Sequence, residues 1–201
     1  MEKTATINRL GIPNSGMSNR EQELSARKIV SVCEHYSFTP LASCNCLDIS
    51  RNGAVLAGLE RHFAGCARTD LRDDILEDES FDLIICDNSY QHFEDLPYLA
   101  DRMYSLMKHG GFCYFAGKSS LFPGGSWKND GDPVYRSISS LKKSLTYFWI
   151  HDYTPLILEN PAVFERDPES MSVMSGIVPL AVRKRIYPHM AEFVWVLTKK
   201  K

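Results

Sequence analysis

A short apolar run that leads through a polar turn into a helical pattern limits the folds open to this chain. The apolar run covers residues 44–49, the polar turn residues 50–53 and the helical pattern residues 54–63. This order predicts a buried strand that passes directly into a helix, as in the sheets of α/β proteins. Ligands of such sheets bind at the carboxyl ends of the strands. Four residues are therefore expected at a ligand-binding edge: Asp48, Ser50, Asn52 and Gly53.

A second stretch, residues 81–86, has the clearest pattern of a buried strand in the chain. It reads Phe-Asp-Leu-Ile-Ile-Cys, and its apolar side chains stand on both faces. Such a run predicts a strand in the middle of a sheet that is covered on both sides. Polar and aromatic residues follow in 87–95, at the same carboxyl edge. The candidates for chemistry among them are Asp87, Asn88, Tyr90 and His92.

The next segment continues the alternation of strands and helices. Asp95 can cap a helix whose apolar stripe runs from Leu96 to Met107, and Gly110-Gly111 is expected to end that helix. Residues 112–116 then form another buried strand. The repeated order of strand, turn and helix predicts a parallel sheet with right-handed crossovers.

The flanking segments are less regular. Residues 1–17 show no periodicity and are expected to form an N-terminal arm, either mobile or laid over a pocket, ahead of a packing helix that ends at Thr39-Pro40. Residues 117–136 are rich in glycine and proline and long for a connection, which is typical of a lid-like or binding loop. The remaining expected elements are a helix over 137–145 and strands over 147–153 and 192–197.

The length and charge of the chain limit its size class and its partners. With 201 residues it is expected to form a single domain over 1–201. The net charge of -2 does not provide the basic field that nucleic acid binding requires. No apolar run is long enough to span a bilayer, and the N-terminus lacks a signal-peptide core. We therefore expect a cytoplasmic protein.

The six cysteines fall mostly inside apolar segments. This distribution predicts buried free thiols in a reducing compartment. Cys44 and Cys46 share one face of the first expected strand, but two further ligands at zinc-like spacing are missing. No metal site is therefore predicted.

Several of these segments together resemble the class I S-adenosylmethionine-dependent methyltransferases, and the methyltransferase type 11 group in particular. The residues that carry the resemblance are Leu47-Asp48-Ile49, 81–86, His92 and 106–112. In that family the first strand runs into a glycine-rich turn, a Phe-Asp-Leu-Ile strand precedes a turn with histidine, and a Gly-Gly pair introduces the next strand. The resemblance covers 45–116 well. It continues more weakly to 193–199, which looks like the family's closing antiparallel strand.

The resemblance implies an α/β, Rossmann-like three-layer sandwich, with a mostly parallel sheet, a reversed C-terminal strand and helices on both faces. Between the first strand and Phe81 the sequence has room for only one helix and one short strand, because two βαβ units would need more residues. One strand/helix unit of the family's sheet is therefore expected to be deleted, and which unit is missing stays open. Asp70 either replaces the acid that grips the ribose hydroxyls or belongs to the next strand.

The resemblance also implies S-adenosylmethionine as the cofactor. Asp48 and the turn at 50–53 would lie beside its methionine and ribose, and Asp70 near its ribose or adenine. The residues from Asp87 to His92 would lie between the cofactor and the methyl acceptor.

The turn after the first strand departs from the family. It reads Ser50-Arg51-Asn52-Gly53 where the family has two or three glycines, which let the backbone approach the ligand and adopt positive φ. Asparagine tolerates positive φ better than most residues, whereas arginine does not. Arg51 would also bring a positive charge toward a cofactor that carries a sulfonium, unless it reached the methionine carboxylate.

The leading hypothesis is methyl transfer to a small-molecule, saccharide or lipid-type acceptor. His92 and Tyr90 are the catalytic candidates, His92 as the base for an oxygen acceptor, although His92 could instead only pack against the next helix. The alternative is a catalytically degenerate methyltransferase-like protein that acts as a binding or regulatory subunit, with a homodimer or a protein partner left open. A nicotinamide-dependent oxidoreductase is weaker, because Gly-x-Gly-x-x-Gly is absent.

Overall fold

A six-stranded sheet is the centre of the computed structural model, which describes residues 19–50, 58–68, 71, 76–119, 135–159 and 192–200. The strand order is β2-β1-β3-β4-β6-β5. The four strands from β2 to β4 in this order are parallel, whereas β6 is antiparallel to both β4 and β5. The predicted α/β fold with a reversed C-terminal strand is confirmed. The strands are β1 (Asn45–Asp48), β2 (Gly65–Arg68), β3 (Phe81–Asp87), β4 (Met107–Lys118), β5 (Phe148–Asp152) and β6 (Glu192–Lys199).

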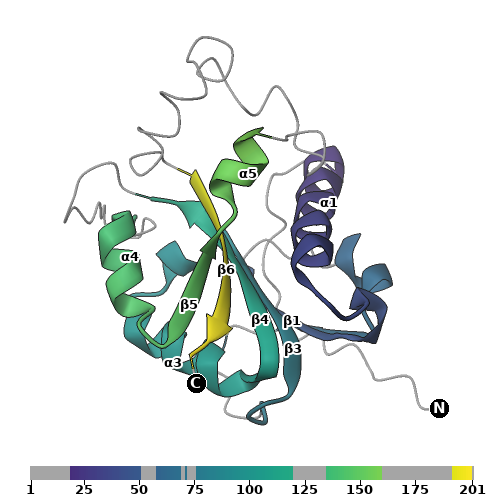
Figure 1. Ribbon diagram of the computed structural model, residues 1–201, viewed down its shortest axis with the longest axis horizontal. Helices are drawn as coiled ribbons and strands as arrows, with labels where there is room; N and C mark the ends of the chain where they lie inside the picture. Colours follow the sequence, from purple (N-terminus) through teal and green to yellow (C-terminus); the bar gives the residue numbers. More distant parts are fainter. Residues whose placement is uncertain are drawn as a thin grey trace.

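Helices cover both faces of this sheet and complete three layers (Figure 1). α1 (Asn19–Tyr36) packs on one face, and α3 (Leu96–Leu106) and α4 (Ile138–Ser144) pack on the other. The shorter described elements are α5 (Thr154–Glu159) and the 3-10 turns η1 (Leu41–Ser43), η2 (Glu60–His62) and η3 (Tyr90–His92).

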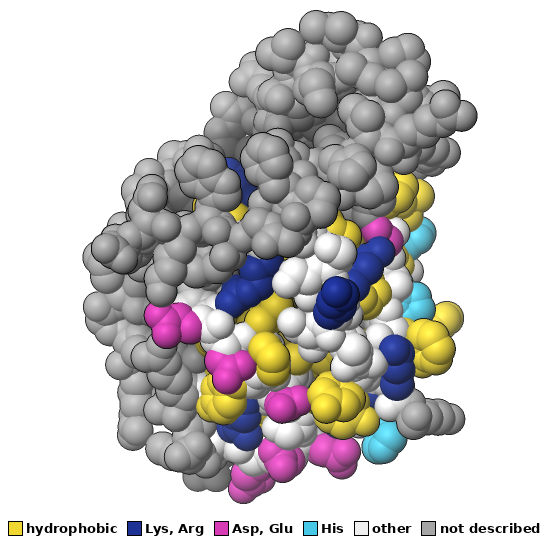
Figure 2. Space-filling model, turned by 90° about the vertical axis from the view of Figure 1, so that its left-hand side faces the viewer, with side chains coloured by type: hydrophobic (Ala, Val, Ile, Leu, Met, Phe, Trp, Pro, Cys, Tyr) yellow, Lys and Arg dark blue, Asp and Glu magenta, His cyan; other side chains and the backbone are white. Residues whose placement is uncertain are grey.

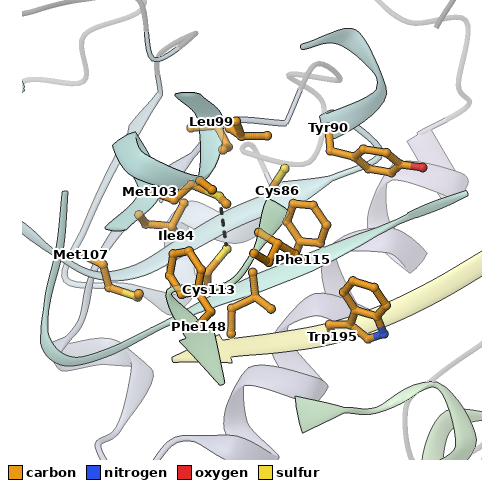
Figure 3. Packing of buried hydrophobic residues seen from close by; sticks show 14 of the residues in the cluster. Ile84, Cys86, Tyr90, Leu99, Met103, Met107, Cys113, Phe115, Phe148 and Trp195 are labelled. Carbon is orange, nitrogen blue, oxygen red and sulfur yellow. Dashed lines mark hydrogen bonds between the residues drawn. The ribbon is translucent and has the colours of Figure 1, made fainter. Parts of the chain in front are cut away.

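The central strands β3 and β4 are buried on both faces, as predicted for residues 81–86. Ile84 and Cys113 belong to the core cluster under α3 and α4, while Ile85 and Tyr114 belong to the cluster under α1. All four side chains are inaccessible to solvent. Figure 3 shows α3 packed on β4, where the thiol of Cys113 lies 3.8 Å from the sulfur of Met103. Successive side chains of one strand thus fill two cores.

The boundary between α3 and β4 differs from the sequence-based prediction. The helix ends at Leu106, and β4 begins at Met107, so Gly110-Gly111 lies inside the strand and does not end the helix. The pairing of β3 with β4 shifts register between Phe81 and Leu83, opposite these glycines. Gly110 has a φ of 81°, and a Cβ on Gly111 would lie 2.9 Å from the carbonyl oxygen of Asp82. The glycine pair therefore allows the β-bulge at the start of β4.

The connection between β1 and β3 contains one described strand, β2, at the edge of the sheet. This agrees with the room for a single short strand that the sequence predicts there. The predicted turn 51–53, residues 54–57 of the predicted helix 54–64, and Asp70 lie outside the described residues, as do the arm 1–17 and residues 120–134 of the predicted loop 117–136.

No helix among the described residues is long and apolar enough to cross a membrane. On the face shown in Figure 2, the described side chains of both charge signs are interspersed and form no single continuous basic area.

Candidate functional site

The strand order reverses between β1 and β3, and this places two acids at neighbouring strand ends. From β1 the chain passes outward to β2, and it later returns to β3 on the other side of β1. Open α/β sheets bind ligands at such a reversal, outside the carboxyl ends of the strands. β1 ends at Asp48 and β3 ends at Asp87, and both side chains are buried.

Ser50 joins these two strand ends. Its backbone N–H donates to Oδ1 of Asp48 at 2.8 Å, and its hydroxyl oxygen accepts a hydrogen bond from the backbone N–H of Asp87 at 3.1 Å. Its carbonyl oxygen accepts from the guanidinium of Arg68, at the end of β2, at 3.3 Å. Ser50, the first residue of the turn that departs from the family, therefore has a structural role. A glycine at this position has no hydroxyl and would lose the hydrogen bond from the N–H of Asp87.

A helix also reaches the site. The hydroxyl of Ser25, in α1, donates to Oδ2 of Asp87 at 3.2 Å. Ser25 could not be identified from the sequence, because it lies 62 positions from Asp87 and α1 shows only the pattern of a packing helix. The one local feature that could have indicated a role for Ser25 is its small polar side chain next to Ala26, which belongs to the buried stripe of α1.

Each of the two carboxylates keeps one oxygen without a partner. Oδ2 of Asp48 and Oδ1 of Asp87 are buried and have no hydrogen-bond partner among the described residues. Burial raises the pKa of Asp48 to about 6, with a further upward contribution from Asp87, while the bonds to Ser50 and the charge of Arg68 act in the opposite direction. Buried polar atoms are normally bonded, so these oxygens fit a ligand that donates hydrogen bonds or carries positive charge.

The turn after β3 begins at Asn88, which adopts a positive φ of 49°. Asparagine tolerates this left-handed conformation better than most residues. Its backbone N–H donates to the carbonyl oxygen of Ala116 at 2.9 Å, and its own carbonyl oxygen accepts from the side-chain amide of Gln91 at 2.8 Å. The structure therefore brings Asp48, Ser50, Asp87 and Asn88 to one edge, as the sequence predicts.

Tyr90 lies in the core and not in the open part of this edge. Its ring packs against Phe115 (Figure 3) and Phe193. Its hydroxyl donates to the carbonyl oxygen of Lys118, and burial raises its pKa. A Cβ on Gly117 would lie only 2.7 Å from the ring. This packing favours a structural role over the catalytic role predicted for Tyr90.

His92 ends the η3 turn and is half-buried. Its backbone N–H donates to the carbonyl oxygen of Ser89 at 2.9 Å. Asp95 caps α3 by accepting from the N–H of Tyr98 at 3.0 Å, as predicted. Arg136 donates to the carbonyl oxygens of the two residues between them, Phe93 at 3.0 Å and Glu94 at 2.7 Å. Arg136, at the end of the loop predicted to be lid-like, was not predicted as a site residue, because its partners lie more than 40 positions away.

Three of the predicted cofactor residues, Asn52, Gly53 and Asp70, lie outside the described residues. β2 ends at Arg68, two positions before Asp70. Within the described part of the chain, no group of three or more histidine, cysteine or acidic side chains could hold a metal ion. The cysteines are free thiols, and five of the six are buried.

Comparisons with known proteins agree with this architecture. Residues 29–115 match a family model described as a methyltransferase domain. Among solved structures, the chain is similar to a putative S-adenosylmethionine-dependent methyltransferase from Listeria monocytogenes, with a TM-score of 0.53 and 10% identity over 89% of this chain and 99% of that protein.

A second similar structure is geranyl diphosphate C-methyltransferase from Streptomyces coelicolor A3(2), solved with Mg2+, geranyl diphosphate and S-adenosyl-L-homocysteine. Its TM-score is 0.53 and its identity 12%, over 96% of this chain and 85% of that one. A phosphoethanolamine N-methyltransferase 2 from Haemonchus contortus matches at a TM-score of 0.49 and 12% identity, over 87% of this chain, which spans only 53% of that protein. No curated protein matches the chain significantly in sequence. At these identities the structural likeness shows the fold alone.

Proposed function

We propose that this chain is a class I methyltransferase that transfers the methyl group of S-adenosylmethionine to a small-molecule, saccharide or lipid-type acceptor, which the match of residues 29–115 and the fold support. The observation that carries the proposal is the pair of buried carboxylates at the strand reversal, each with an oxygen that has no partner among the described residues. Strand reversals are where α/β folds of this kind bind their ligands.

The chemistry of the donor set fits this cofactor. Its methionine part carries an ammonium and a sulfonium, and its ribose carries hydroxyl donors, while ionised carboxylates only accept hydrogen bonds. Asp48 and Asp87 would hold these groups. Ser50 fixes the carboxylate of Asp48 and the backbone of Asp87, Ser25 bonds the carboxylate of Asp87, and Asn88 fixes the turn beside them. Asn52, Gly53 and Asp70 remain proposed cofactor residues on the strength of the family resemblance.

The bound cofactor supplies an already activated methyl group, so the protein's own residues mainly position the acceptor and exclude water. Holding two reactants in line is worth up to about 7–11 kcal/mol in favourable cases. His92 is the proposed base, because a neutral imidazole can accept the proton of a hydroxyl acceptor near neutral pH. Tyr90 is left out of this role, since its hydroxyl is already bonded to a backbone carbonyl in the core.

The departure of the glycine-rich turn supports a second candidate, a methyltransferase-like protein that has lost the cofactor and serves as a binding or regulatory subunit. Arg51 replaces a small residue at a point where the family's backbone approaches its ligand. A fold alone does not establish activity. Ser50 does not support this second candidate. Its hydroxyl oxygen bonds the N–H of Asp87, so the replacement of a glycine by Ser50 is not by itself a sign that the cofactor site has been lost.

Thermal unfolding of the full chain with and without S-adenosylmethionine, and separately with S-adenosylhomocysteine, tests the proposal. A ligand at a hundred times its dissociation constant should add about 2.7 kcal/mol to the free energy of unfolding. For a domain of this size each kcal/mol corresponds to roughly 2–4 °C in Tm. If neither compound shifts the Tm, and calorimetry detects no binding, the methyltransferase proposal fails and the non-catalytic alternative is favoured.

A further inference from the structure

Arg136 is a partly buried cation that has no ion-pair partner among the described residues. Its Nη2 donates to the carbonyl oxygens of Phe93 and Glu94, while its Nη1 is buried and has no acceptor among the described residues. No described acidic side chain forms an ion pair with it. Buried guanidinium groups normally use both of their terminal nitrogens, because an unpaired buried donor is costly.

The surroundings of Arg136 do not compensate for its burial. Burial lowers its pKa, which Asp95 and Tyr90 oppose electrostatically. The carboxylate of Asp95 is engaged with the N–H of Tyr98 as the cap of α3, and the hydroxyl of Tyr90 donates to Lys118. A charge taken out of water in this way requires a partner, and the described residues offer none that binds Nη1.

The position of Arg136 connects this free nitrogen with the proposed reaction. The two carbonyl groups that it binds directly follow His92, so the guanidinium clamps the same turn that carries the proposed base. A guanidinium presents parallel donors that match the oxygens of a phosphate or a carboxylate. One nitrogen of the fork fixes the turn, and the other remains for a ligand.

We propose that Nη1 of Arg136 binds an anionic group, a phosphate or a carboxylate, of the methyl acceptor. This inference rests on the proposed function, since it assigns the substrate class to the same site. It narrows the small-molecule acceptors to those that carry a negative charge near the position to be methylated. Arg136 is then a specificity-determining residue, while His92 remains the proposed base.

Titration of the full chain with simple anions tests the inference without knowledge of the acceptor. Inorganic phosphate, and in a separate arm acetate, is titrated at pH 7.5 with total ionic strength held constant by sodium chloride, and Tm is measured with and without S-adenosylhomocysteine. We expect a saturable rise in Tm, and the more effective anion identifies whether the site prefers phosphate or carboxylate. Arg136→Gln should weaken the apparent affinity for that anion at least tenfold, because it removes the charged donor.

Arg102→Gln is the matched control, since Arg102, on α3, is also partly buried but pairs with Asp78, which lies before β3. This variant should keep the affinity of the unmodified protein for the anion. If Arg136→Gln does not fold, Arg136→Lys keeps the charge without the fork and should weaken the affinity severalfold. Equal anion affinity in the unmodified protein and the folded Arg136 variant, or no effect of either anion, overturns the inference.

Binding of S-adenosylhomocysteine, measured by calorimetry on the same proteins, separates this inference from the proposed function. If the cofactor binds but the anions have no effect that depends on Arg136, the proposal of methyl transfer is retained and the proposal of an anionic acceptor is rejected. If the anions bind in a way that depends on Arg136 but the cofactor does not bind, the anion site is retained and the methyltransferase proposal is rejected.

Discussion

At the scale of single residues, Asp48 combines two properties that a purely structural acid would not need. It is inaccessible to solvent, and one of its oxygens has no partner in the described part of the chain. Its pKa of about 6 lies above the ordinary value of 3.8. Ionisation of Asp48 therefore lowers the stability of the fold, which is expected of an acid whose partner is a ligand.

The first prediction concerns Asp48→Asn and the pH dependence of stability. Because the folded-state pKa is raised, folded Asp48 keeps its proton between about pH 4 and pH 6 while the unfolded chain loses it, so its contribution to stability falls as the pH rises through this window. Asparagine does not titrate. The variant should therefore gain on the order of 2–3 kcal/mol relative to the unmodified protein between pH 4 and pH 7.5, as measured by denaturant unfolding. Parallel pH profiles for the two proteins would contradict the assignment.

The same variant should bind S-adenosylmethionine at least tenfold more weakly at pH 7.5, because a charged acceptor is lost. Calorimetric titration measures this directly. A variant that is more stable and binds less tightly is the signature of a functional acid. Unchanged affinity in the folded variant would remove Asp48 from the cofactor site.

Ser25→Ala tests whether α1 fixes the second carboxylate. The change removes the 3.2 Å hydrogen bond to Asp87 and leaves both of its oxygens without a side-chain partner among the described residues. We expect the dissociation constant for S-adenosylmethionine to rise severalfold, by about 1 kcal/mol, since the carboxylate is no longer oriented. Ser144→Ala, which removes a hydroxyl bonded to the Ser140 carbonyl in α4, is the control. Equal affinities for S-adenosylmethionine in the two variants would show that the hydrogen bond from α1 is not required to orient the carboxylate of Asp87.

At the scale of elements, the strands could be predicted from the sequence far better than the boundaries and the contacts. Residues 81–86 could be predicted as a central strand because their apolar side chains stand on both faces. In the structure both faces of this strand are covered by core residues, which requires such side chains. The end of α3 was predicted wrongly because Met107 continues the helical stripe and is also buried as the first residue of β4. Only the pairing of Met107 with Phe81 distinguishes the two, and this contact is not local in sequence.

The bulge at the start of β4 leads to a prediction about Gly111. A Cβ there would lie 2.9 Å from the carbonyl oxygen of Asp82 and 3.1 Å from that of Lys108, and backbone atoms cannot move aside as a flexible side chain can. Gly111→Ala should therefore lower the free energy of unfolding by about 1–3 kcal/mol. Gly110→Asn is the control, because the space around Gly110 is open and asparagine tolerates its positive φ. Thermal unfolding measures both, and a Tm for Gly111→Ala equal to that of the control would contradict the bulge argument.

At the scale of the whole molecule, the site depends on the strand order more than on any one motif. Asp48, Ser50, Asp87 and Asn88 could be predicted because each stands directly after an apolar strand, and parallel strands bring their carboxyl ends to one edge. Ser25, Arg68 and Arg136 could not, because each reaches the edge through a contact between distant segments. The roles of the turn residues Asn52 and Gly53 and of Asp70 in cofactor binding stay predictions.

The strand order also predicts where a bound cofactor changes the dynamics of the protein. If the ligand occupies the reversal between β1 and β3, S-adenosylhomocysteine should slow amide hydrogen exchange in peptides that cover Asp48–Ser50 and Asp87–His92. β5 (Phe148–Asp152) lies at the opposite edge of the sheet, beyond β4 and β6, and its exchange should not change. Exchange followed by mass spectrometry, with Asp48→Asn under the same ligand concentration as the control, measures the difference. Protection that appeared at β5 and not at the two strand ends would place the ligand elsewhere, because bound ligands protect first the backbone that they contact and hold closed.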